Sequence, residues 1–233
     1  MIFLKRWLKK RLINKLVSKK NKAGIRFILK LQNRLSSYVM EIIKEDERRK
    51  GGIHPKHWVT DFHNFFLDNI EENHSVLEIG CAYGHLSKTL SQKAKKVLGI
   101  DNREDAISYA KENIKNDNLE FCCSDFFDFT NEKVFDVVVM SNVLEHIDHR
   151  VKFLKKASQL ADVVLVRVPA FDRHWLIPYK KSLNVEWRLS LDHSIEHTEQ
   201  DLRLEVEQAN LIIDDLFCKW GNYCCVLVPE TQS

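Results

Sequence analysis

The residues best suited to chemistry in this sequence follow short apolar runs. Gly80 and Gly84 come directly after the run 76–79. Glycines between a strand and a helix let the backbone approach a ligand closely and leave helix N–H groups available to it. Asp101 ends the next apolar run, and a carboxylate about twenty residues after such glycines suits the two hydroxyls of a ribose. These residues indicate a nucleoside-binding turn.

Two later runs also end in polar residues. Asp125 and Phe126 follow the third run, where a carboxylate could accept a hydrogen bond from an exocyclic amine while the ring lies against a base. Ser141 and Asn142 end the fourth run. Open α/β sheets bind ligands at the carboxyl ends of their strands, so we expect the four groups to meet at one edge of a sheet.

A structural role competes with ligand binding at several of these positions. Asp101 is also a good helix N-cap residue, and Asp125 suits a cap or a turn. Glu145 and His146 can order their loop without touching a substrate. These roles would have to coincide at successive strand ends, which favours ligand binding for the group as a whole.

The elements that must position these residues alternate between strands and helices. We expect strands at 75–79, 96–100, 118–123, 134–140, 162–168, 211–218 and 222–229. We expect the intervening helices at 85–93, 103–116, 148–160 and 198–210. Continuous apolar strands are typical of a parallel sheet covered on both faces, so the pattern predicts a doubly wound α/β fold with seven mostly parallel strands. Only three residues join the last two strands, which must therefore be antiparallel.

The chain begins with a basic helical extension. We expect this extension at 1–52 and the catalytic domain at 53–233. Residues 1–34 hold twelve Lys and Arg and no acidic residue, whereas the remainder holds 24 basic and 33 acidic side chains. The expected helices lie at 1–22, 25–49 and 56–70. Apolar residues spaced by three and four from Ile28 to Ile42 predict a buried seam, although two heptads are too few to establish a coiled coil.

Four motifs occur in order: EIGCAYG, VLGID, CSDFF and FDVVVMSNVLEH. Together they resemble the class I S-adenosylmethionine-dependent methyltransferases over about residues 74–229. The resemblance implies a Rossmann-like sheet with an antiparallel last hairpin, and S-adenosylmethionine as cofactor. The implied cofactor-binding residues are Glu78, Gly80, Cys81, Ala82, Gly84, Asp101, Asn102, Asp125, Phe126, Ser141 and Asn142. Ala82 departs from the family's glycine motif and asks for an unstrained backbone at that position.

The resemblance implies that the methionine part of the cofactor would be surrounded by Glu78, Gly80, Cys81 and Gly84. Asp101 would hold the ribose, and Asp125 with Phe126 the adenine. Ser141 and Asn142 would line the sulfonium end.

Methyl transfer to a hydroxyl requires in-line positioning and removal of a proton. We expect the general base to be His146, directly after the fourth strand, or His193, just before the helix at 198. Candidate acceptor-binding residues are His54, Lys56, Arg173, Trp175 and His197. We expect no metal. Some ubiquinone-pathway members of the resembled family hold a divalent ion in this segment, but Asn142 stands where an acidic partner would help.

The acceptor is expected to be a sugar or a lipid-linked saccharide of the cell envelope. A long insert from Arg167 to Asp192 mixes aromatic rings with hydrogen-bond donors, which suits a ring bearing hydroxyls and equally suits a loop pinned by buried aromatics. Its motifs resemble family members found with bacterial surface-polysaccharide synthesis. The alternatives are a nicotinamide-dependent oxidoreductase and a binding protein that has lost catalysis.

The basic leader has three interpretations. Residues 1–22 could contact an anionic membrane peripherally, bind nucleic acid, or dock on an acidic body, and we favour the membrane. Nucleic acid is disfavoured because the body is acidic and lacks an RNA-binding module. No run of about 18 apolar residues exists to form a spanning helix. We expect a cytoplasmic protein, located at the inner face of the membrane if the leader binds lipid, and make no prediction of oligomeric state.

Overall fold

A computed structural model describes residues 2–17, 22–50, 52–130 and 135–230. The chain forms two compact units. The larger unit comprises residues 55–173 and 190–233, and the smaller comprises residues 1–54 and 174–189. The smaller unit therefore contains residues 174–189 of the long insert.

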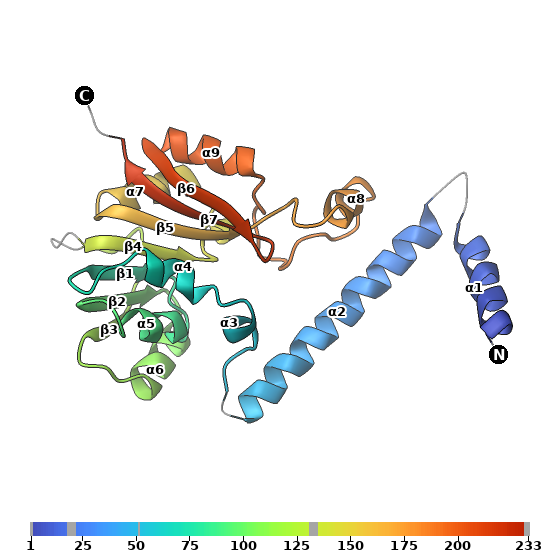
Figure 1. Ribbon diagram of the computed structural model, residues 1–233, viewed down its shortest axis with the longest axis horizontal. Helices are drawn as coiled ribbons and strands as arrows, with labels where there is room; N and C mark the ends of the chain where they lie inside the picture. The colour runs from blue at the N-terminus through green and yellow to red at the C-terminus, as the bar shows by residue number, and fades with distance from the viewer. Residues whose placement is uncertain (1, 18–21, 51, 131–134, 231–233) are drawn as a thin grey trace. The chain divides into compact units, whose positions relative to one another are not determined.

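One seven-stranded sheet forms the centre of the larger unit (Figure 1). Its strands are β1 (Ser75–Ile79), β2 (Lys96–Asp101), β3 (Leu119–Cys123), β4 (Phe135–Ser141), β5 (Ala161–Pro169), β6 (Leu211–Lys219) and β7 (Asn222–Pro229). The spatial order is β3-β2-β1-β4-β5-β7-β6. All neighbours from β3 to β5 run parallel, whereas β7 is antiparallel to both β5 and β6. The predicted fold class and the antiparallel last hairpin are both confirmed.

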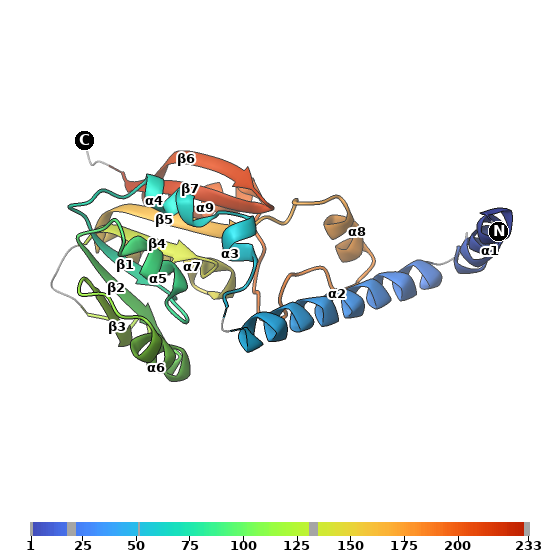
Figure 2. The ribbon, with the colours of Figure 1, turned by 60° about the horizontal axis from the view of Figure 1, so that its bottom comes forward.

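Helices cover both faces of this sheet, as Figure 2 shows. They are α5 (His85–Leu90), α6 (Glu104–Asn113), α7 (Arg150–Ser158) and α9 (Glu199–Gln208), with a short 3-10 turn, η1 (Leu144–His146), after β4. Alternate residues of β4 explain the two cores. Val138 and Met140 pack with α7 and α9, whereas Val137 and Val139 pack with α4 (His63–Asp68) and α5. Residues of α6 form a third, smaller core with the loop after β1.

The prediction of one continuous helix at 56–70 is wrong, because the helix is interrupted. Two short helices occupy this stretch, α3 (Lys56–Val59) and α4 (His63–Asp68). Asp61 lies between them with φ of +50°, in the left-handed region that a continuing α-helix cannot contain. The break lets Phe65 and Phe66 of α4 pack into the sheet core.

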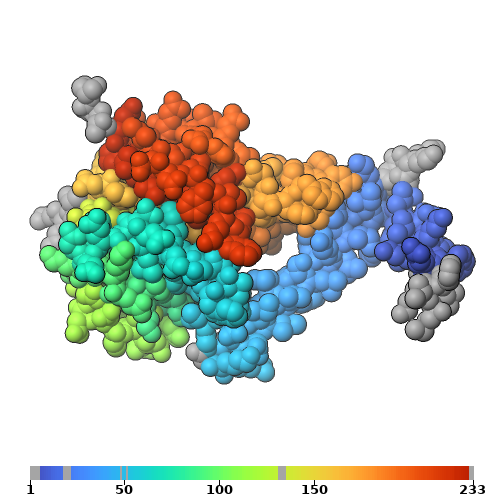
Figure 3. Space-filling view, viewed as in Figure 1, coloured from blue at the N-terminus to red at the C-terminus, as the bar shows by residue number. Residues whose placement is uncertain are grey.

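The smaller unit is helical. It consists of α1 (Ile2–Leu16), α2 (Ala23–Arg49) and α8 (Leu176–Ser182), the last of which lies in a segment expected to be a loop. The first helix ends at Leu16 rather than at 22, and part of the difference lies outside the described residues. Figure 3 shows α2 in light blue, with side chains exposed along the length of the helix. Among the described helices, none is both long and apolar enough to cross a lipid bilayer.

Candidate active site

The turn between β1 and α5 brings backbone to the edge of the sheet. Gly80 and Gly84 have φ of +71° and +76°, a conformation that side chains rarely adopt. A Cβ on Gly80 would lie 2.6 Å from Val143, in the segment after β4. The turn thus depends on glycine both for its dihedral angles and for its close approach to the end of β4.

Ala82 does not have the unstrained backbone that its side chain would favour. Its φ is +50°, in the left-handed region where an L-residue costs roughly 1–2 kcal/mol. The Ala82 N–H donates to Asp101 Oδ2 at 2.8 Å, which helps to hold this conformation. The expectation for Ala82 is therefore wrong, and the turn is strained at its middle residue.

Asp101 joins the turn after β1 to the end of β2. Its Oδ1 accepts from the Arg103 backbone N–H at 3.0 Å and lies 3.1 Å from Arg103 Nε. The N-cap of α6 is Arg103, so the interpretation of Asp101 as an N-cap is wrong. The carboxylate is buried at the sheet edge with both oxygens already engaged, which fixes where it points.

Glu78 places a second carboxylate beneath the same turn. It is buried, and Ser87 of α5 donates a hydrogen bond to it. Burial raises the pKa of Glu78 to about 7, with nearby Asp101 adding to the increase. A buried carboxylate of this kind suits a cationic ligand group, because a positive charge would offset the desolvation of the ionised form.

The end of β3 only partly matches the expectation. Asp125 is exposed and its Oδ1 accepts from the Phe127 N–H at 2.7 Å, as in an Asx turn. Phe126 is buried in the main core, with its ring 4.5 Å from that of Phe153 on α7. The structure thus leaves Asp125 at the sheet edge together with exposed Asn102, but it places the Phe126 ring inside the protein.

After β4 the chain enters a buried polar network. Asn142 has φ of +60°, and its Nδ2 donates to Glu145 Oε1 at 2.9 Å. Its Oδ1 accepts from Arg167 of β5, whose guanidinium also lies 4.4 Å from the Phe62 ring centroid. Glu145 is fully buried, and its Oε2 has no hydrogen-bond partner. Sequence reasoning missed Arg167 as a member of this network, although a charge inside the apolar run 163–168 was a visible signal.

The two expected base candidates lie together. The His146 and His193 rings meet edge to face with centroids 4.8 Å apart. Each imidazole has a carboxylate on its Nδ1: Asp192 Oδ2 at 3.2 Å from His146, and Glu196 Oε1 at 3.2 Å from His193. The structure therefore brings together two residues that are 47 positions apart in the sequence.

Glu196 is the functional residue that sequence reasoning missed most clearly. Its side chain is fully buried and forms an ion pair with Arg173 in addition to its contact with His193. Arg173 also donates to the Ala170 carbonyl at 2.7 Å, which helps to hold its guanidinium beside the Glu196 carboxylate. The spacing His193-x-x-Glu196 was the available signal.

Glu145, His146 and His193 each offer one ligand atom to a possible cation. These atoms all lie within 4.8 Å of one another. One carboxylate and two imidazoles form a donor set that suits transition ions better than Mg²⁺. The expectation that the site uses no metal stays a prediction.

The remaining acceptor-binding candidates are dispersed. His197 is fully buried with its Nε2 3.0 Å from Glu205 of α9, so it faces the interior. Lys56 begins α3 in the larger unit. His54 and Trp175 belong to the smaller unit. These four candidates thus divide between the two units.

Comparison with known proteins identifies the family. A family model described as a methyltransferase domain matches residues 70–223, which span the whole sheet except its last few residues. The chain belongs to this family. The family assignment confirms the class I S-adenosylmethionine-dependent methyltransferase fold and its cofactor, S-adenosylmethionine.

Curated relatives of this methyltransferase match over parts of their length. It is 33% identical over 103 residues to a mitochondrial ubiquinone biosynthesis O-methyltransferase of Dictyostelium discoideum, covering 38% of this chain and 32% of that protein. It is 31% identical to a ubiquinone biosynthesis O-methyltransferase of Bradyrhizobium diazoefficiens, covering 43% and 41%. The match thus spans less than half the length of these relatives.

Solved structures share the fold at low sequence identity. A methyltransferase from Haloferax volcanii, in complex with the Trm112 methyltransferase activator, has a TM-score of 0.64 at 16% identity and covers 79% of this chain and 95% of its own. Magnesium protoporphyrin IX methyltransferase from Synechocystis with bound SAH has a TM-score of 0.57 at 19% identity, covering 75% and 82%. These likenesses support the sheet topology described above.

Proposed function

We propose that this methyltransferase acts on a hydroxyl group of a small molecule, with His193 as general base. The observation that carries this proposal is the pair formed by His193 and the buried carboxylate of Glu196 at the carboxyl-end edge of the sheet. When bound, S-adenosylmethionine supplies the methyl group. The chain's own residues must bind it, orient the acceptor and remove the acceptor's proton.

The residues at the strand ends fit the cofactor. Gly80 and Gly84 give the turn after β1 positive φ angles, which suit a turn whose backbone approaches a ligand. The buried carboxylate of Glu78 suits the amino group of a methionine moiety, and we assign Asp101, at the end of β2, to the ribose diol. We assign Asn142, at the end of β4, to the sulfonium end because it is anchored by both Arg167 and Glu145.

Glu196 gives His193 the properties of a base. An ionised carboxylate accepts a hydrogen bond from Nδ1–H, which fixes the tautomer and leaves the lone pair on Nε2. It also stabilises the imidazolium that forms when Nε2 takes the acceptor's proton. Glu196 is thus a positioning residue, held in turn by Arg173. His146 is the second candidate, but its partner Asp192 is largely exposed and screened by solvent.

For the acceptor we favour a saccharide or lipid-linked saccharide. The support is the insert after β5, in which the Trp175 and Tyr179 rings lie 6.1 Å apart at a tilt of 39° and the basic residues Lys180 and Lys181 of α8 follow. The ubiquinone O-methyltransferases among the relatives favour a second candidate, a phenolic hydroxyl on an aromatic ring. Both are hydroxyl acceptors and make the same demand on His193.

Incubation with radiolabelled S-adenosylmethionine tests the proposal. We expect label to enter a carbohydrate or lipid-linked fraction of a cell-envelope extract, and simple catechols serve as the phenolic comparison. Label confined to RNA or protein would contradict the small-molecule assignment. Cofactor binding without transfer to any acceptor would instead support a protein that has lost catalysis.

Substitution of the base separates catalysis from binding. We expect His193→Ala to lower the transfer rate by about 10²–10⁴-fold with little change in cofactor affinity, since the imidazole acts on the acceptor's proton. Glu196→Gln should shift the pH dependence of the rate, which a purely structural residue would not do. His74→Ala is the matched control, because His74 directly precedes β1 at the opposite end of the strand. A His193→Ala protein with the normal rate contradicts the assignment.

We also propose that residues 1–22 contact an anionic membrane from the cytoplasmic side. The support is charge: this stretch has nine Lys and Arg and no acidic residue. Trp7, Leu8 and Leu12 of α1 are exposed and provide apolar groups for an interface. Sedimentation with vesicles that contain anionic lipid, compared with zwitterionic vesicles, tests this contact.

A further inference from the structure

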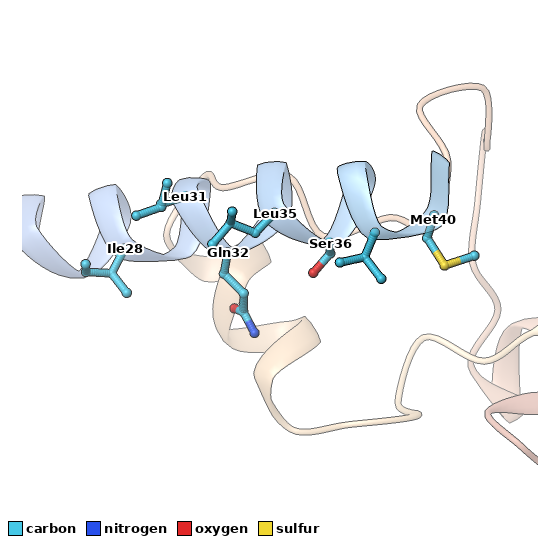
Figure 4. A pocket seen from close by; sticks show the side chains of 7 residues that line it. Ile28, Leu31, Gln32, Leu35, Ser36 and Met40 are labelled. Carbon is cyan, nitrogen blue, oxygen red and sulfur yellow. The ribbon is translucent and has the colours of Figure 1, made fainter. Parts of the chain in front are cut away.

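A long apolar stripe on α2 remains exposed within its unit. We define the α2 seam as Ile28, Leu31, Leu35, Tyr38 and Ile42. All five side chains are exposed, from 42% for Ile28 to 67% for Ile42. Three of them, Ile28, Leu31 and Leu35, line an open groove of about 530 Å³ together with Gln32, Ser36, Val39 and Met40 (Figure 4). A contiguous apolar surface of this length is typical of a docking site.

The α2 seam is distinct from the face that α2 uses inside its own unit. Leu29 packs with Leu183 and Val185 of the insert. Arg26 and Asn33 donate hydrogen bonds to carbonyls of the same insert, at 3.1 and 2.7 Å. At 100° per residue, these positions project more than a quarter turn away from the α2 seam. The helix therefore has one satisfied face and one apolar face without a partner among the described residues of its unit.

The spacing of the α2 seam fits a pair of helices. Its residues are separated by three, four, three and four positions, which is the a/d pattern of two heptads. In this frame Arg34 and Glu41 both occupy g positions on one flank of the stripe. Flanking charges of this kind set the orientation of helix pairs.

The flanking charges complement each other in one arrangement of two copies. In an antiparallel pair, each core residue faces the core residue that is equally distant from the two-fold axis on the other side. A flanking residue lies beside the flanking residue of the other copy that falls between the same two core layers. An axis between positions 36 and 37 layers Leu35 on Tyr38 and Leu31 on Ile42. The same axis places Arg34 of each copy beside Glu41 of the other, giving two identical ion pairs.

Other arrangements lack this complementarity. A parallel pair would set Glu41 beside Asp46 of the second copy, which places like charges together. An anionic lipid surface would meet four carboxylates within residues 41–47, at the end of the stripe. The charge pattern thus favours a second copy over lipid for this face of α2.

We infer that the α2 seam is an antiparallel self-association site, which makes the protein a homodimer with two-fold symmetry. Leu31, Leu35, Tyr38 and Ile42 of each copy form the layers, and the pair would bury on the order of 1,000 Å² in total, toward the low end of specific interfaces. Weak and transient complexes lie at this end of the size range, so we expect a dissociation constant of order micromolar. This inference is independent of the proposed acceptor and base.

Sedimentation velocity over a range of concentrations of the full chain tests the inference. We expect the mass to change from one to two chains near micromolar concentration. Leu35→Glu should leave the chain monomeric throughout, because it puts a charge in the central layer. Ser37→Glu is the matched control on an exposed position off the seam and should associate normally. Circular dichroism checks that both variants retain their helices.

A charge exchange distinguishes the antiparallel pair from other dimers. Arg34→Glu should raise the dissociation constant roughly tenfold or more, because it replaces two attractive pairs with two repulsive ones. Glu41→Arg should do the same, and the double variant should recover the affinity of the original protein. Lys30→Glu makes the same change in charge away from the g positions and should have little effect.

Several outcomes would overturn the inference. One is a chain that is monomeric at all concentrations, as would occur if the α2 seam docked on its own chain. Another is a dimer that Leu35→Glu does not disturb. A third is a double variant whose dissociation constant is no lower than that of either single variant. Binding of the monomer to anionic vesicles that depends on Leu35 would assign this face to lipid instead.

Discussion

At the scale of single residues, the site is dominated by carboxylates that each have a defined partner. Asp101 is held by Ala82 and Arg103, whereas Glu196 is held by Arg173 and contacts His193. Among the described residues, the Glu78 side chain accepts from a neutral donor, the Ser87 hydroxyl. Burial raises the pKa of Glu78 to about 7, because it disfavours the charged form.

The raised pKa of Glu78 predicts pH-dependent cofactor affinity. Because the pKa is about 7 in the folded state and 4.5 ordinarily, the ligand-free protein holds this proton more tightly than the unfolded chain between these values. Its stability therefore falls as pH rises through that window. A bound amino group favours the ionised form, so affinity for S-adenosylhomocysteine should increase as pH rises through about 7.

Calorimetry on either side of this pKa checks the prediction. Glu78→Gln should weaken binding and flatten its dependence on pH, whereas Glu112→Gln, on the exposed side of α6, should change neither. Equal affinity of the original protein for S-adenosylhomocysteine on both sides of the pKa would show that Glu78 does not pair with the cofactor.

At the scale of elements, the turn from β1 to α5 concentrates backbone strain at the site. Three of its residues, Gly80, Ala82 and Gly84, have positive φ. Glycine adopts this conformation without cost, but Ala82 does not. The turn is thus a place where a substitution toward glycine should stabilise the fold.

We expect Ala82→Gly to raise the melting temperature by a few degrees, since it relieves roughly 1 kcal/mol of left-handed strain. The greater freedom of glycine in the unfolded chain offsets part of this gain. Ala106→Gly, inside α6, is the contrasting control and should lower the melting temperature. Differential scanning calorimetry compares the two. A lower melting temperature for Ala82→Gly would mean that the turn is not strained at this residue.

The sheet was predictable from sequence because its strands are continuous apolar runs bounded by polar residues. The antiparallel hairpin followed from the short connection between Lys219 and Asn222 alone. The break at Asp61 was not predictable, because it depends on how α4 packs against the sheet. For the same reason the sequence could not place Phe126, whose motif resembled a ligand contact but whose ring enters the core beside Phe153.

The sequence predicted which residues of the site lie at strand ends, but not which residues hold them in position. Asp101 lies at a predicted strand end and therefore lies where the sequence indicated. Glu196 and Arg173 reach His193 through a loop whose course depends on tertiary contacts, so only the structure shows their connection. His197, four residues after His193, contacts Glu205 of α9 instead.

At the scale of the whole molecule, charge separates the two ends of the chain. All charged side chains in residues 1–34 are basic, whereas the rest of the chain has nine more acidic than basic side chains. The basic leader and the α2 seam both lie in the smaller unit, while the cofactor and base residues lie in the larger one. We therefore expect changes in α1 or the α2 seam to alter location or assembly without altering cofactor affinity, which calorimetry on the Leu35→Glu protein checks.

The central claim is that successive strand ends of one sheet bind S-adenosylmethionine, with Asp101 holding its ribose. Calorimetric titration of the original protein and Asp101→Ala with S-adenosylhomocysteine tests it most directly, with NAD as the comparison ligand. We predict binding of S-adenosylhomocysteine but not of NAD, and a loss of roughly tenfold or more in Asp101→Ala, since two hydrogen bonds to a charged group are removed. Unchanged affinity in a folded Asp101→Ala protein would contradict the account.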